Sequence, residues 1–143
     1  MRDQFLGVKG GSDMLGTLPL MAIVIIIYNI VVYLTGLSME SQITTITLIS
    51  GAVWTVTVGD LIVFAALMLL FLELVNSTKT GTSTIVNHGL SMLVLLIALV
   101  EFLVLPPFGT STFFALVLLA LFDVIAGFTV TITAARRDFT VGE

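Results

Sequence analysis

The chain has 143 residues, of which 58% are apolar and only 10% are charged, and its mean hydropathy is +1.21. A soluble domain of this size needs a charged surface to stay dispersed, so this composition predicts an integral membrane protein. Nine acidic and five basic residues give a net charge of -4, and the basic residues are scattered without forming a basic patch, which argues against nucleic-acid binding. The lack of cysteine excludes disulfides and thiolate metal sites.

Four apolar segments are each long enough to cross a hydrocarbon core of about 30 Å as a helix. They cover about residues 18–36, 52–75, 85–105 and 111–135. We therefore expect an all-α fold, a four-transmembrane-helix antiparallel bundle spanning residues 17–135. An N-terminal segment (1–16) precedes it and a tail (136–143) follows it. The N-terminal segment is expected to be retained, because the first apolar run is too long for a signal peptide.

The boundary before the second helix is ambiguous. Residues 43–49 mix threonine with isoleucine and leucine. The second helix can therefore begin well before Ala52, or this stretch forms an interfacial segment or a short strand. The later boundary is clearer, because Pro106 and Pro107 are expected to stop the third helix. The short connection that follows makes the third and fourth helices antiparallel neighbours.

The basic residues all fall on one side of this four-pass arrangement. Two precede the first helix, one lies between the second and third, two follow the fourth, and the other two loops contain none. They are Arg2, Lys9, Lys79, Arg136 and Arg137. The positive-inside rule then places both termini in the cytoplasm, and we expect the membrane to be a bacterial inner (plasma) membrane.

Four acidic residues interrupt or border the apolar segments without a basic residue beside them. They are Asp60, Glu73, Glu101 and Asp123. A carboxylate in a bilayer costs several kcal/mol unless it is protonated, hydrated, bound to a cation or hydrogen-bonded. Helical spacing places Asn29, Asp60, Glu101 and Asp123 inside the bundle, with Asp60 on the weakest inward stripe. Glu73 is expected near the cytoplasmic interface, within reach of headgroup water.

A proton or cation pathway is one function that these polar residues predict. The candidate residues are Asp60, Asp123, Glu101, Asn29, His88 and Glu73. In that interpretation Asp60 and Asp123 exchange the proton, Glu101 forms the outer entry, and His88 and Glu73 complete the route at the cytoplasmic end. The alternative is that these side chains hydrogen-bond between helices and serve packing or assembly.

Enzyme chemistry is not expected. The chain has one histidine and no Glu-x-x-His pair, nucleophile triad or phosphate loop, so neither a metal site nor a cofactor is predicted. Short loops leave little to bind a soluble small molecule. We therefore expect an accessory or assembly subunit of a larger membrane complex, or a structural homo-oligomer, whose partners are the lipid bilayer and other membrane subunits or itself. The alternative is a proton- or cation-conducting channel or transporter.

Overall fold

The computed structural model describes residues 19–76 and 82–140, which are mostly helical (75%). The predicted N-terminal segment (1–16) and the loop carrying Lys79 lie outside this range. The elements in chain order are α2 (Leu20–Ile30), the π-helical turn η1 (Val31–Thr35), β1 (Gln42–Thr47), β2 (Val53–Thr57), α3 (Val58–Asn76), α4 (Thr82–Val104), the 3-10 turn η2 (Pro106–Phe108) and α5 (Ser111–Thr140).

Three of the described helices are long and apolar enough to cross a membrane, which supports the prediction of transmembrane helices for three of the four predicted segments. Their apolar windows are Val58–Val75 in α3, Val86–Val104 in α4 and Ser111–Val130 in α5. The apolar helix Leu20–Thr35 is shorter. At 1.5 Å of rise per residue it reaches roughly 24 Å, against a hydrocarbon core of about 30 Å.

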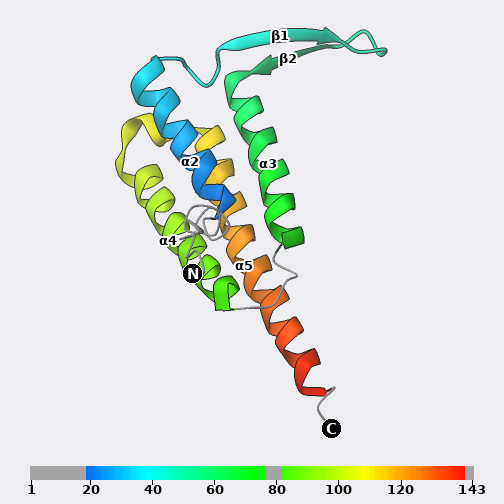
Figure 1. Ribbon diagram of the computed structural model, residues 1–143. Coiled ribbons are helices and arrows are strands. Elements are labelled where there is room, and N and C mark those ends of the chain that lie inside the picture. The colour runs from blue at the N-terminus through cyan, green and yellow to red at the C-terminus, as the bar shows by residue number, and fades with distance from the viewer. Residues whose placement is uncertain (1–18, 77–81, 141–143) are drawn as a thin grey trace, which may run out of the picture.

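Helix α5 is the centre of the packing. It contacts α2, α3 and α4, and α2 also contacts both α3 and α4. Figure 1 shows α2 in front of α5, with α3 and α4 on either side. The core lies between α2 and α5, and its largest fully buried side chains are Pro19, Met21, Val24, Tyr28, Phe108, Phe113 and Leu116. Much of the outer surface of the helices is apolar and exposed, as expected of helices surrounded by lipid.

The predicted start of the second helix, at about residue 52, is wrong. Residues 53–57 form strand β2, and α3 begins only at Val58. The stretch Val-Trp-Thr-Val-Thr consists of β-branched and aromatic residues, which favour a strand. Of the alternatives open for residues 43–49, the short strand is the one found, as β1 ends at Thr47.

Prolines and a capping residue set the end of α4 and the start of α5. Helix α4 ends at Val104, just before Pro106 and Pro107, as predicted. Thr110 caps α5, because its Oγ1 accepts a hydrogen bond from the Phe113 amide at 3.1 Å. Helix α5 continues to Thr140, so the first residues of the predicted tail (136–143) are helical. Figure 1 shows this end of α5 extending beyond the other helices.

The two strands form an antiparallel hairpin that projects sideways from the start of α3 (Figure 1). The Leu48 amide donates to the Ala52 carbonyl at 2.8 Å, which closes a three-residue loop of Ile49, Ser50 and Gly51. Gly51 has φ of +83°, the left-handed conformation that such a loop requires at its last position.

Candidate functional site

Polar side chains gather in the half of the molecule that contains the start of α2. We call this group the polar cluster, and its members are Glu73 on α3, Asn87, His88 and Ser91 on α4, and Asp123 on α5. Exposed fractions are only 6% for Glu73, 4% for His88, 3% for Ser91 and 6% for Asp123. The prediction that Glu73 reaches headgroup water is therefore wrong, because neighbouring helices cover its carboxylate.

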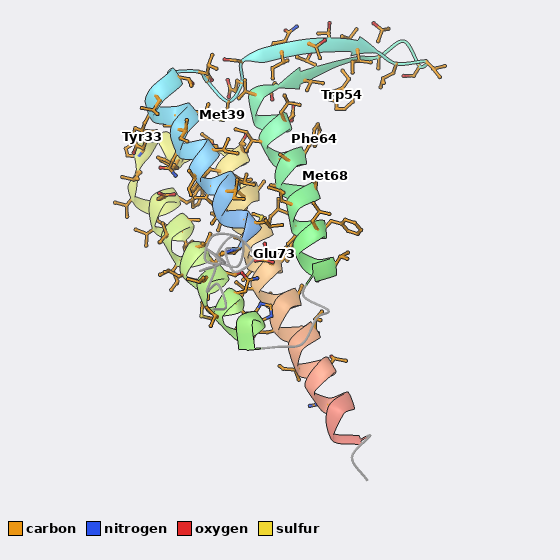
Figure 2. All side chains as sticks on the ribbon, in the orientation of Figure 1. Tyr33, Met39, Trp54, Phe64, Met68 and Glu73 are labelled. Carbon is orange, nitrogen blue, oxygen red and sulfur yellow. The ribbon has the colours of Figure 1, made fainter. Side chains whose placement is uncertain are left out.

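Glu73 connects three helices. Its Oε2 accepts a hydrogen bond from the Leu20 amide at 2.8 Å, and its Oε1 accepts one from Asn87 Nδ2 at 3.1 Å. Pro19 precedes α2 and provides no side-chain cap, so the Glu73 carboxylate satisfies an amide that the helix start leaves unpaired. A negative charge also interacts favourably with the positive end of a helix dipole. Figure 2 shows Glu73 close to this start of α2.

Three buried polar atoms of the polar cluster have no hydrogen-bond partner among the described residues: Asn87 Oδ1, Ser91 Oγ and Asp123 Oδ2. The Ser91 hydroxyl lies near the Asp123 carboxyl but outside hydrogen-bond geometry. Asp123 also interacts electrostatically with His88 and Glu73. Buried polar atoms without partners are costly, so they mark positions where a structure keeps polarity for a reason other than packing alone.

The imidazole of His88 occupies a notch on α5 that a glycine leaves open. A Cβ built at Gly127 would lie 2.5 Å from His88 Cε1 and 2.6 Å from its Nδ1. The ring also packs against Phe128, with ring centroids 5.6 Å apart. Gly127 therefore allows α4 and α5 to approach closely with the imidazole between them.

A second polar pair, Asn29 and Glu101, lies apart from the polar cluster. Asn29 Nδ2 lies 3.3 Å from both carboxylate oxygens of Glu101 and also donates to the Ile25 carbonyl at 3.1 Å. Both side chains are only half-buried. They line an open groove of about 450 Å³ between α2 and α4, which we call the α2–α4 groove. Its other lining residues are Ala22, Ile25, Ile26, Ile30, Leu34, Val94 and Ile97.

Asp60 has a local role at the start of α3. Its Oδ2 accepts hydrogen bonds from the amide and the hydroxyl of Thr57, both at 2.9 Å, and the Asp60 amide donates back to Thr57 Oγ1 at 3.2 Å. This reciprocal pattern is a capping box. The Thr-x-x-Asp spacing in the sequence could have identified it.

Asp60 and Asp123 do not meet. Residue Gly59 packs beside Thr112 at the start of α5, whereas Asp123 lies eleven residues further along that helix. This separation corresponds to about 16 Å of helix rise. The expected proton exchange between Asp60 and Asp123 therefore has no direct geometric basis within one chain.

An aromatic group fills the interior of the other half of the molecule, and sequence patterns did not identify it. We call it the aromatic cluster, and its members are Tyr28, Phe108 and Phe113, all fully buried. The Tyr28 and Phe113 ring centroids are 4.7 Å apart, and those of Phe108 and Phe113 are 4.8 Å apart. The Tyr28 hydroxyl is paired with Thr110 Oγ1 at 2.7 Å.

Between the two clusters the interior is apolar. From Asp123 back along α5, Ala120, Leu116 and Phe113 are buried at three- and four-residue steps. Within the described residues, no continuous line of polar side chains joins the polar cluster to the hairpin end through this core. No group of three or more histidine, cysteine or acidic residues in the described ranges is arranged to hold a metal ion.

Comparisons with protein-family models, with curated proteins and with solved structures gave no match for this chain. The geometry of the two polar groups and of the surface is therefore the basis for a functional proposal.

Proposed function

We propose that this chain is an accessory or assembly subunit of a larger complex in a bacterial inner membrane, or the protomer of a structural homo-oligomer. It would cross the bilayer four times, as an antiparallel bundle with both termini in the cytoplasm. The observation that carries this proposal is the position of Glu101, a carboxylate that lines an open apolar groove on the side of the molecule.

The order of helix ends supports the four-pass arrangement. Glu73 near the end of α3 contacts Leu20 at the start of α2 and Asn87 near the start of α4. These three helix ends therefore lie at the same side of the molecule, and α5 extends beyond them with Arg136 exposed. If that side is cytoplasmic, the positive-inside rule is satisfied for Arg136.

The α2–α4 groove supports a docking role. A half-buried carboxylate that faces lipid costs several kcal/mol, and a hydrogen-bond donor from a neighbouring helix would reduce that cost. Asn29 already donates to Glu101 at 3.3 Å, a long distance for such a bond, and the carboxylate retains free acceptor capacity. A transmembrane helix that brings a polar donor to Glu101 and apolar side chains to Ile26, Ile30 and Ile97 would fit this groove.

A matched pair of substitutions tests this role. Ile97 lines the α2–α4 groove, while its neighbour Leu96 is exposed on α4 outside the groove lining. Ile97→Trp should fill the groove and displace the partner helix, whereas Leu96→Trp adds the same side chain without blocking the groove. We expect native mass spectrometry after mild detergent extraction to show a complex for the parent and Leu96→Trp, and a lone chain for Ile97→Trp.

The masses also identify which kind of assembly is present. A multiple of the chain mass indicates a homo-oligomer, and an additional subunit indicates a larger complex. A lone monomer from the parent protein after mild extraction would contradict the proposal. So would complexes of equal yield in both tryptophan variants.

The second candidate is a proton- or cation-conducting protein, and the polar cluster favours it. Its buried acids and histidine come from three helices, and Asn87, Ser91 and Asp123 each retain a buried polar atom without a partner among the described residues. Such groups in a membrane core mark ion pathways in many transporters. Because the aromatic cluster fills the other half of the core, the ion could not cross that half within one chain. Conduction would therefore require a pathway between protomers there.

Flux measurements in proteoliposomes separate the two candidates. For the subunit proposal we expect no proton or cation flux above that of empty vesicles. Flux in the parent that is lost in Asp123→Asn but retained in Asp60→Asn would instead support conduction through the polar cluster. Asp60 is the appropriate control, because its carboxylate caps α3 and lies far from Asp123 along the bundle.

A further inference from the structure

The β1–β2 hairpin has two chemically different faces. Residues directly opposite each other on paired strands point to the same side of the sheet. The face that we call the apolar face carries the pairs Thr44–Val56 and Ile46–Trp54. The opposite face, which we call the threonine face, carries the pairs Thr45–Thr55 and Thr47–Val53.

The apolar face turns toward the outer surface of α3. The ring centroids of Trp54 and Phe64 are 6.2 Å apart in an edge-to-face contact. Phe64 begins a stripe of exposed side chains that continues through Met68 and Phe71 at helical spacing. Figure 2 shows Trp54 below the hairpin on the side of Phe64 and Met68. The apolar face and the exposed stripe of α3 therefore form one continuous apolar surface.

The hairpin carries no charge, and the helices cover little of it. Residues 41–59 contain no acidic or basic side chain. Every residue of β1 is exposed, and so are Leu48 beside the loop and Ile49 within it, which is completely exposed. An isolated two-stranded hairpin is at best marginally stable in water, so this one needs a surface to lie on. Its strands reach roughly 20 Å from the helices at about 3.3 Å per residue.

We propose that this hairpin lies flat in the membrane interface beside α3 and binds the lipid bilayer through its apolar face. Helix α3 begins at Val58, so the hairpin sits where the apolar span starts. At that level Trp54 and Ile46 meet the boundary between headgroups and acyl chains, where tryptophan is enriched, and the threonine face meets headgroups and water. The missing charges remove the electrostatic cost of this position.

The inference requires that α3 crosses the bilayer, and it holds for either candidate function. It assigns a membrane contact to a segment with no span of its own. The hairpin would widen the footprint of a small protein and fix how deeply α3 sits in the bilayer.

Trp54 is the single tryptophan of the chain, so its fluorescence tests the proposal directly. The full-length protein is reconstituted in phosphatidylcholine vesicles whose acyl chains carry bromine either near the headgroup or near the methyl end. Iodide is present on both sides of the membrane in a parallel series. We expect bromine near the headgroup to remove about half of the Trp54 emission, bromine near the methyl end to remove much less, and iodide to quench weakly.

A matched variant reports on the opposite face. Trp54→Phe combined with Thr55→Trp moves the only indole by one residue, onto the threonine face. Its quenching pattern should reverse, with strong iodide quenching and weak bromine quenching. Helical content from circular dichroism checks that this variant folds, and the parent measurement stands without it.

Two results would overturn the proposal. Strong iodide quenching of Trp54 in the parent would place the apolar face in water. Protection of Trp54 from both quenchers would mean that protein covers it, as in a contact with a second copy of the chain.

Discussion

The polar cluster and the aromatic cluster both fill space between packed helices, the first with polar side chains and the second with aromatic rings. In the aromatic cluster, three fully buried rings fill the space between α2 and α5, and the Tyr28 hydroxyl is satisfied at 2.7 Å. In the polar cluster, four side chains from three helices are buried and Asn87 is half-buried, yet three polar atoms of the cluster have no partner among the described residues. The comparison indicates that one half of the core is optimised for packing, while the other half retains costly polarity.

The largest effect is expected from opening the aromatic cluster. Phe113→Ala removes a fully buried ring that contacts Tyr28 and Phe108. We expect a loss of about 3 kcal/mol in the free energy of unfolding in bicelles, at the low end of the range for soluble proteins, because a separated membrane helix buries the ring in lipid. Phe114→Ala, at an exposed neighbouring position, is the control and should cost much less. Equal losses would show that the aromatic cluster is not the stabilising half.

A smaller effect is expected from overfilling the polar cluster. Gly127→Ala places a methyl group 2.5 Å from His88 Cε1, so the imidazole or α5 must move. Overpacking of this kind costs about 1–3 kcal/mol, and we expect a loss of that size in the same bicelle assay. At Gly89 on α4 a methyl group meets no atom within 4 Å, so Gly89→Ala should be neutral or slightly stabilising. A neutral Gly127→Ala would mean that the imidazole is loosely held.

The smallest effect concerns the hydrogen bond of the Tyr28 hydroxyl in the aromatic cluster. Tyr28→Phe keeps the ring but removes its hydrogen bond with Thr110, and we expect a loss of about 1 kcal/mol. Tyr33→Phe is the matched control, because Tyr33 is exposed and should lose little. A double-mutant cycle with Thr110→Val isolates the coupling between Tyr28 and Thr110, and a coupling near zero would contradict the assigned bond.

The helices could be predicted from sequence because their signals are local. Apolar length identified α3, α4 and α5, and Pro106 and Pro107 ended α4 where expected. On the third helix Ser91 and Ala98 are buried, but Glu101, which is expected inside the bundle, is only half-buried. Side-chain burial on the first helix was predicted less well. The helix face that carries Met21, Val24 and Tyr28 is buried, whereas Asn29, which was expected to point inward, is only half-buried.

The hairpin and the polar cluster could not be predicted with the same rules. Threonine and isoleucine at residues 43–49 fit a strand or a helix, and only the cross-strand partner decides between them. Glu73 was assigned to the interface by counting residues along its own helix. Its burial depends on the start of α2, which lies 53 residues earlier in the chain and covers the carboxylate. Tertiary contacts of this kind leave no pattern within one segment.

The π-helical turn Val31–Thr35 marks a place where the chain could be one residue shorter. A π-helical turn accommodates one more residue than an α-helical turn over the same rise, and it absorbs the extra residue locally. A chain one residue shorter between Ile30 and Gly36 would therefore form a regular helix and keep Tyr28 and Met39 in their present positions. This is the place where the protein should tolerate a deletion, and where related sequences should differ in length while the core on both sides stays the same.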